Sequence, residues 1–134
     1  MSDERAGMSD ERAAAGLEMR TQVLGADHVA AAMADPEDIF RPLQELVVEY
    51  CWGTVWNRPQ LPPRMRSMLT ISMLIARGHE QELALHIRGA LNNGCTELEI
   101  AEAIVHSAVY CGVPAAMSAA RVARQVFASA GESA

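Results

Sequence analysis

Two segments of this sequence are apolar on almost every side, and they limit the possible folds more than any other feature. Residues 68–76 read MLTISMLIA, and residues 100–109 interrupt a run of Ala, Ile and Val only at Glu102, His106 and Ser107. A helix with so little polar surface must be buried all round. A domain of 134 residues can bury about one such helix. The second therefore predicts a homo-oligomer, in which subunits cover each other's apolar faces.

Signals that begin and end helices recur along the chain. Thr96 and Glu99 have the spacing of a capping box, Gly78 is placed to end a helix, and Asp35 before Pro36 is typical of an N-cap. Together with Asp27 as a cap and Pro42 as a helix start or kink, these signals predict helices over about 27–33, 42–52, 64–77, 79–92, 96–111 and 114–128. The predicted fold class is all-α, a single-domain helical bundle of about six helices.

The composition supports helices and excludes several classes of function. Only 4% of the residues are aromatic although 50% are hydrophobic, so the core must consist of Ala, Leu, Val, Ile and Met, a mixture that favours helices. The formal charge of -6 leaves no basic surface for nucleic acid. All 11 basic residues are Arg, which excludes a Schiff-base lysine and a lysine-type phosphate loop.

The first residues repeat themselves as MSDERAG and then MSDERAA. We predict that residues 1–16 form a disordered tail and that residues 17–134 form the domain. The tail lacks the apolar stretch of a secretion signal, and no later apolar run approaches about 18 residues, so no membrane partner is expected. Cys51, Cys95 and Cys111 contain no CxxC pair. They indicate a reducing cytoplasm rather than a disulfide framework or a zinc knuckle.

One predicted helix carries a stripe of polar residues suited to acid/base chemistry. His79, Glu82 and His86 recur at i, i+3 and i+7, so their side chains share a face with Leu83 and Ala90. Partial desolvation there would raise the pKa of a glutamate and lower that of a histidine, making the pair usable near pH 7. The alternative is an exposed Glu with a helical partner. Because the spacing is not that of HExxH, we expect no metal.

Three further features are candidates for the same chemistry. Trp52 and Trp56 lie four residues apart and could form a wall against a small ring-shaped ligand, although core packing is the commoner role of paired aromatics. His106 and Tyr110, also four apart, are either a hydrogen-bonded core pair or donors in a pocket. Arg66, before the first apolar segment, could hold a carboxylate in bidentate fashion, or be a plain surface residue.

The run RMRSMLTISMLIARGHEQELALHIRGALNNGCTELEIAEAIVHSAVYCGVPAA resembles the carboxymuconolactone decarboxylase family. LALHIRGALNNG and AVYCGVPAA are its most specific pieces, and the resemblance extends over about residues 17–128. It implies an alkylhydroperoxidase D-like helical fold that assembles as a trimer or hexamer. It also implies decarboxylation of 4-carboxymuconolactone without a cofactor, in the protocatechuate branch of β-ketoadipate metabolism.

A related branch of that superfamily uses a CxxCxxxH helix for thiol redox chemistry. Here the corresponding stretch places His79, Glu82 and His86 at those positions, with no cysteine. Relatives more usually carry Arg in place of His79, so its expected role is charge rather than proton transfer. Two alternatives remain open: a thiol redox enzyme that relies on the three cysteines, and a non-catalytic oligomeric binding module on the same scaffold.

The implied substrate is a lactone carboxylate whose own carbonyl accepts the electrons left by CO2, so no cofactor is expected. Our hypothesis assigns Arg66 to anchoring a carboxylate and Glu82 or His86 to proton delivery. Either His86, or His106 with Tyr110, would hydrogen-bond the developing oxyanion. The two Trp side chains would surround the departing carboxylate. Arg66 and Arg88 are candidates for the positive patch that a dianionic substrate requires.

Overall fold

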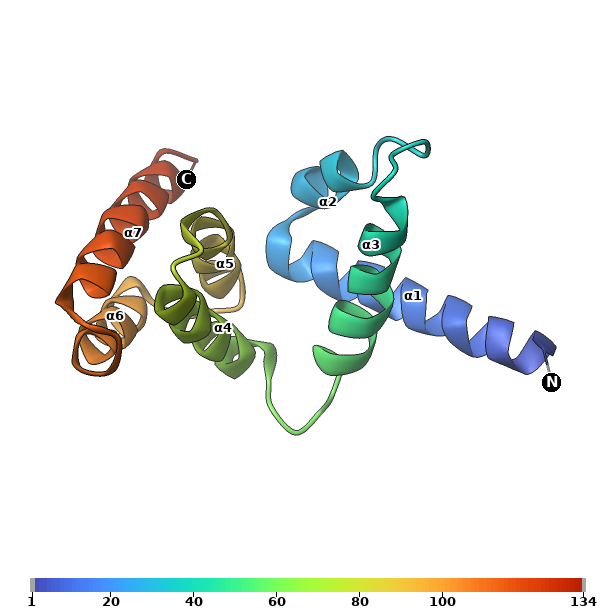
Figure 1. Cartoon of the computed structure of the whole chain (residues 1–134), viewed down its shortest axis with the longest axis horizontal. Helices are drawn as coiled ribbons and strands as arrows, with labels where there is room; N and C mark the ends of the chain where they lie inside the picture. Colours follow the sequence, from blue (N-terminus) through green and yellow to red (C-terminus); the bar gives the residue numbers. More distant parts are fainter. Residues whose placement is uncertain (1, 134) are drawn as a thin grey trace. The chain divides into compact units, whose positions relative to one another are not determined.

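The computed structural model describes residues 2–133, and their side chains over residues 10–131. Within this range the chain forms only helices and turns, which confirms the predicted all-α class (Figure 1). The elements are α1 (Ser2–Leu24), α2 (Ala26–Ala32), α3 (Arg41–Leu46), a π-helix η1 (Val47–Val55), α4 (Pro63–Arg77), α5 (Glu80–Asn92), α6 (Glu97–Cys111) and α7 (Val113–Ser133). Contacts group them into two compact units, Met1–Leu61 and Pro62–Ala134, where one bundle was predicted.

The N-terminal unit is built on a close approach of α1 and η1. A Cβ atom at Gly16 would lie 2.0 Å from the Val48 carbonyl oxygen and 2.8 Å from the Gly53 nitrogen, so only glycine allows this spacing. Helix α1 includes residues 2–16, for which the sequence predicted a tail, and continues past residue 17. The Ala, Glu and Arg residues of the repeat are strong helix formers, which accounts for the extension.

Two predicted helix caps in this unit are wrong. Helix α2 begins after Gly25, whose φ is 94°, and Asp27 lies within its first turn without capping it. The Asp35 carboxylate accepts a hydrogen bond of 2.9 Å from the Glu37 backbone N–H, and the Asp38 carboxylate accepts one of 3.0 Å from the Phe40 N–H. These bonds form Asx turns, which compete with helix formation. The next helix therefore begins only at Arg41.

The C-terminal unit follows the predicted helix boundaries closely. Helix α4 ends at Gly78 in the left-handed conformation, with a φ of 72°. The capping box that opens α6 is confirmed, because Thr96 and Glu99 exchange two hydrogen bonds of 3.0 Å. Helix α7 runs to Ser133, beyond the predicted end at residue 128. The largest core residues from the four helices are Ile71, Ile75, Leu83, Ile87, Ile100, Ile104, Val122 and Val126.

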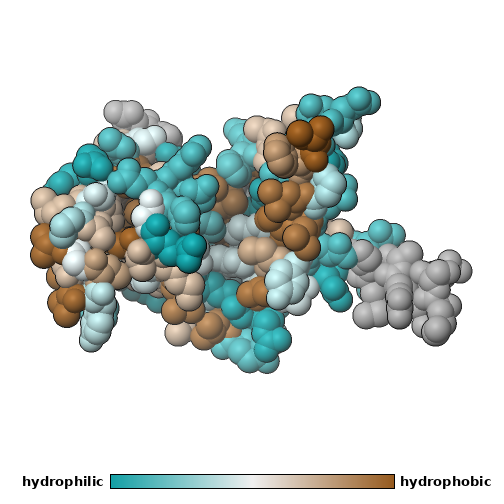
Figure 2. All heavy atoms as spheres, in the orientation of Figure 1, coloured by the Kyte–Doolittle hydropathy of each residue, from teal (hydrophilic) through white to brown (hydrophobic). Residues whose placement is uncertain are grey.

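The two apolar segments are buried on one face only, so burial all round is wrong for a single chain. In α4 the side chain of Met73 is 62% exposed, and in α6 those of Val105 and Val109 are 63% and 79% exposed. Figure 2 shows hydrophobic residues, coloured brown, at the surface of the molecule. A second chain remains the predicted cover for these faces. None of the helices between residues 2 and 133 combines the length and the apolar character needed to cross a membrane.

Candidate active site

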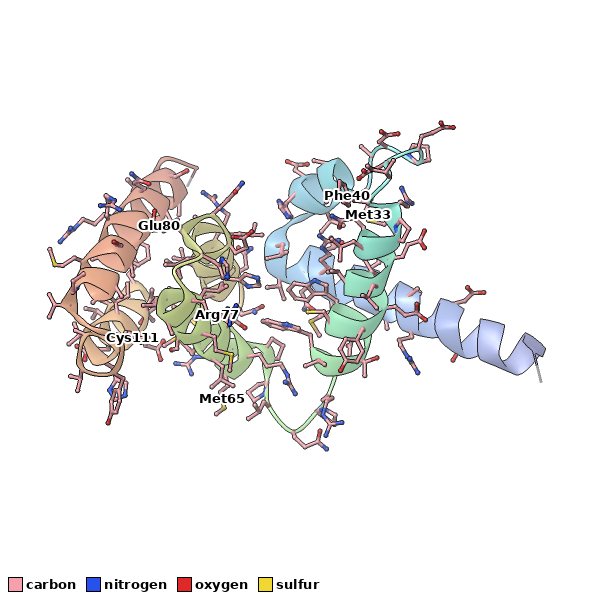
Figure 3. The ribbon with its side chains drawn as sticks, viewed as in Figure 1. Met33, Phe40, Met65, Arg77, Glu80 and Cys111 are labelled. Atoms are coloured by element: carbon pink, nitrogen blue, oxygen red, sulfur yellow. The ribbon has the colours of Figure 1, made fainter. Side chains whose placement is uncertain are left out.

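The polar stripe predicted on one helix lies at the N-terminal half of α5, which begins at Glu80 (labelled in Figure 3). His79 is the residue just before the helix, and its side chain is exposed. Glu82 lies in the first turn and is also exposed. His86, one turn later, is half-buried, and its Nδ1 atom is screened from solvent. The stripe thus passes from solvent into the body of the unit.

Helical geometry explains why the two ends of the stripe differ. Leu83 and Ala90 are 2% and 0% exposed and belong to the core. At about 100° per residue, His86 lies within about 60° of both, whereas Glu82 lies about 80–100° from each. The apolar surroundings predicted for the imidazole are therefore present. The neighbours of Glu82 within its own unit do not provide the desolvation that was predicted for its carboxylate.

Arg66 lies in the first turn of α4, half-buried, with its Nε atom screened from solvent. Its backbone carbonyl accepts a hydrogen bond of 2.8 Å from the Thr70 hydroxyl. The second candidate for a positive patch, Arg88, donates from Nη2 to the Ser129 hydroxyl at 3.2 Å and thereby ties α5 to α7. The Arg88 guanidinium thus has a structural partner within its own unit.

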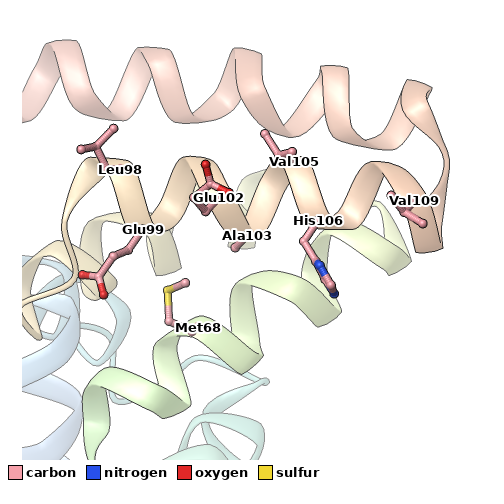
Figure 4. A pocket seen from close by; sticks show the side chains of 8 residues that line it. All are labelled: Met68, Leu98, Glu99, Glu102, Ala103, Val105, His106 and Val109. Atoms are coloured by element: carbon pink, nitrogen blue, oxygen red, sulfur yellow. The ribbon is translucent and has the colours of Figure 1, made fainter.

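His106 and Tyr110 lie together on α6, with ring centroids 5.0 Å apart. Both side chains are exposed, so the interpretation as a core pair is wrong. His106 lines an open groove of about 660 Å³, in which Met68 projects from α4 towards α6 (Figure 4). The other lining residues all belong to α6: Leu98, Glu99, Glu102, Ala103, Val105 and Val109. This groove does not bring His106 together with Glu82 and His86.

Trp52 and Trp56 stack on one another within the N-terminal unit, as their spacing predicted. Their ring centroids are 4.7 Å apart and their planes are tilted by 31°. Both are buried, at 3% and 6% exposure. The Asn57 amide donates to the Trp52 carbonyl at 2.8 Å and to the Ala15 carbonyl at 3.3 Å, which fixes the end of η1 against α1. No sequence signal predicted the π-helix η1, a form often found at functional sites.

The three cysteines are free thiols. Burial raises the pKa of Cys51 and of Cys95, although a nearby arginine opposes the shift in each case. A thiol with a raised pKa is protonated at neutral pH and is a poor nucleophile. This weakens the thiol redox alternative. Among the described residues, no group of three or more His, Cys, Asp and Glu side chains is arranged to hold a metal ion.

Comparison with known proteins matches residues 41–125 to the model of the carboxymuconolactone decarboxylase family. A nitrosuccinic acid decarboxylase of Metarhizium robertsii is 47% identical over 112 residues, which are 84% of this chain and 78% of the relative. A 4-carboxymuconolactone decarboxylase of Acinetobacter baylyi is 42% identical over 125 residues, 92% of this chain and 93% of the relative. An uncharacterized 15.0 kDa protein of Paracoccus denitrificans is 34% identical over 88 residues, 64% of this chain and 66% of the relative.

The match to the decarboxylase of Acinetobacter baylyi spans nearly the whole of both chains. The family model covers α3, η1 and α4 to α6, including the stripe on α5 and Arg66, and it extends into α7. The structure adds that the matched residues form helices, with the boundaries given above. The chain therefore belongs to the carboxymuconolactone decarboxylase family.

Proposed function

We propose that this protein decarboxylates 4-carboxymuconolactone, or a closely related small acid, without a cofactor. Family membership together with two decarboxylase relatives makes the chain a carboxy-lyase. The observation that carries the choice of substrate is the 42% identity over 92% of this chain to a 4-carboxymuconolactone decarboxylase. The second relative is named for a different acid, nitrosuccinic acid, so relatives of this chain differ in substrate and the substrate is the first property to test.

The two named substrates share one chemical arrangement. Each has a carbon that bears a carboxylate and a carboxymethyl arm and that is joined, directly or through a conjugated C=C bond, to a group that can accept an electron pair. In the lactone that group is the conjugated ring carbonyl, and in nitrosuccinic acid it is the nitro group. When the bond to CO2 breaks, its electron pair moves into that group. Because the substrate supplies its own electron sink, an organic cofactor or a metal has no obligatory role.

The residues to which we assign substrate anchoring, oxyanion binding and proton delivery lie in the unit Pro62–Ala134. Arg66 would anchor a carboxylate with its planar guanidinium. His86 would hydrogen-bond the developing oxyanion, since its side chain is half-buried and its Nδ1 atom is screened from solvent. The Glu82–His86 pair would then deliver a proton to the carbon next to the lactone carbonyl. The contributions of His79, of His106 with Tyr110, and of Trp52 and Trp56 remain predictions.

An assay with both acids tests this function. We expect the ultraviolet absorbance of 4-carboxymuconolactone to fall with release of one equivalent of CO2, both with and without a chelator. A variant with Cys51, Cys95 and Cys111 all changed to Ser should keep that activity. Loss of activity in this variant would favour the thiol redox alternative. Failure of the wild-type protein to release CO2 from either acid would favour the non-catalytic binding module.

The proposal includes a homo-oligomer of three or six subunits acting in the cytoplasm. Support for assembly comes from the exposed apolar side chains on α4 and α6 and from Val113 and Met117 on α7, which are 61% and 62% exposed. Support for a reducing compartment comes from the three free thiols. The formal charge of -6 argues against nucleic acid as a partner.

A further inference from the structure

One charged side chain lies in the interior of the described part of the chain. Arg20, on α1, is 6% exposed, and it is the only charged residue among the buried side chains over residues 10–131. Transferring an ionised group from water to a protein interior is strongly unfavourable unless the charge is paired. The surroundings of Arg20 must therefore contain a compensating group, or must be built to receive one.

The neighbours of Arg20 in the N-terminal unit do not neutralise its charge. Its Nη1 atom lies 4.0 Å from the sulfur of Met33, which is a weak acceptor (Met33 is labelled in Figure 3). Its Nε atom is screened from solvent and has no acceptor among the described residues. No ion pair of Arg20 with a described carboxylate is formed. The Arg20 guanidinium thus has N–H donors without a strong acceptor among the described residues.

Two titratable groups lie near enough to Arg20 to feel its charge, and both are neutral at pH 7. Burial raises the pKa of the Cys51 thiol on η1, so the thiol keeps its proton. Burial and the charge of Arg20 lower the pKa of His28 on α2, so its imidazole is uncharged. Burial also lowers the pKa of Arg20, but a guanidinium remains protonated in proteins. The result is one uncompensated positive charge among neutral groups.

We propose that Arg20, held between α1, α2 and η1, is a binding site for one carboxylate group of a small organic acid. A guanidinium presents its N–H donors as a planar fork that matches the two oxygens of a carboxylate. Cys51 and His28, whose pKa values respond to the same charge, add no negative charge that would compete with the carboxylate. A phosphate dianion fits less well, because it would bring two negative charges to a single cation. This site goes beyond the proposed function, since its occupation requires no turnover.

The test uses succinate as the probe, because it is a simple unreactive di-acid. Titration calorimetry and thermal unfolding at low chloride should show succinate binding to the wild-type protein. The same measurements on Arg20→Met should show an affinity at least about tenfold lower, the loss typical of one charge-assisted hydrogen bond. Arg121→Met is the matched control, because Arg121 is exposed and lies 3.2 Å from Glu80 in a surface ion pair. This control should bind succinate as the wild type does.

A second readout concerns stability without ligand. If the charge of Arg20 is uncompensated, Arg20→Met should unfold at the same temperature as the wild-type protein or at a higher one. An Arg20→Met protein that is clearly destabilised would mean that the guanidinium has a structural partner, such as a carboxylate of a second copy, and would overturn the proposal. Unchanged succinate affinity in Arg20→Met, or no succinate binding by the wild type, would overturn it as well.

Two further variants complete the design. Arg20→Lys keeps the charge but loses the fork, so it should fold and bind succinate more weakly than the wild type; if it fails to fold, the role of Arg20 is structural and the proposal falls. Ser72→Ala should bind succinate as the wild type does, because Ser72 is an exposed residue of α4 with no assigned part in the chemistry or in the proposed site. A protein that binds succinate through Arg20 but decarboxylates neither acid would refute the proposed function and leave this inference standing.

Discussion

The Asn93 side-chain amide donates a hydrogen bond of 2.9 Å to the hydroxyl of Ser67, joining the end of α5 to the beginning of α4. Ser67 is 0% exposed and follows Arg66, while Asn93 ends the helix that carries Glu82 and His86. A second contact of 3.4 Å, from the same amide to the Pro63 carbonyl, reinforces the junction. This pair sets the register of the two helices to which the proposed chemistry is assigned.

Ser67→Ala should therefore lower the free energy of unfolding by about 0.5–1.5 kcal/mol, because it removes the shorter of the two hydrogen bonds made by the half-buried Asn93 amide. Urea titration followed by circular dichroism measures the change. Ser72→Ala is the control: Ser72 is exposed on the same helix, and its hydroxyl bonds only to the Met68 carbonyl, at 3.0 Å. The account of this junction fails if the two variants are equally stable.

Gly16→Ala should destabilise the N-terminal unit by more than about 1 kcal/mol, because a methyl group cannot lie 2.0 Å from the Val48 carbonyl oxygen. Thermal unfolding of Gly16→Ala and Gly131→Ala would be compared. Gly131 lies in α7 with nothing within 4 Å of an added Cβ, so this change should be neutral or slightly stabilising. A Gly16→Ala protein as stable as the wild type would show that α1 and η1 do not approach closely.

Stability should fall as the pH rises past the ordinary thiol pKa of 9.0, and Cys95 should contribute to this fall. Burial raises the pKa of the folded thiol, which also lies 3.5 Å from the Arg64 carbonyl. At a pH between the pKa of the thiol in the unfolded chain and its pKa in the folded protein, only the folded thiol keeps its proton. Unfolding then releases one proton, so a higher pH favours unfolding. Urea titrations at pH 7–10 should show a shallower decline for Cys95→Ala and an unchanged one for Cys111→Ala. An equal decline in all three proteins would exclude this contribution.

Light scattering coupled to size exclusion should show a homo-oligomer for the wild-type protein. Val109→Glu should reduce the measured mass, because Val109 is 79% exposed on α6 and a charge there would be buried on assembly. Gln125→Glu adds the same charge at an exposed position of α7 and should leave the mass unchanged. A wild-type mass of a single chain would contradict assembly, and an unchanged mass for Val109→Glu would exclude α6 from the interface.

The sequence predicted the helices of the C-terminal unit well because their ends depend on local signals. Gly78 adopts the left-handed conformation that its position after an apolar helix requires, and the Thr96–Glu99 capping box acts within one turn. The stacking of Trp52 on Trp56 was predictable for the same reason, since residues four apart share a face in an α-helix and nearly share one in a π-helix.

Features that depend on contacts between distant segments could not be predicted. The π-helix η1 packs against α1 through Gly16 and Gly53, and neither glycine signals this contact on its own. Arg20 is buried because it lies on the same face of α1 as the buried residues Gly16 and Val23. A single arginine on such a face usually indicates a side chain that extends to solvent, so its burial could not be predicted. Glu82 is more exposed than His86 because it lies a few tens of degrees further around the axis of α5 from the core residues. The periodicity of a sequence does not resolve so small an angle.

The initial rate of 4-carboxymuconolactone decarboxylation by Glu82→Gln, His86→Ala and Glu80→Gln tests the assigned chemistry most directly. Glu80 is the matched control, because it is an exposed carboxylate in the same first turn. We expect kcat/KM to fall by about a hundredfold or more in the first two variants, with unchanged circular dichroism, and to stay within about twofold in the third. A near-normal rate in Glu82→Gln and His86→Ala would contradict the assignment of proton delivery to this pair.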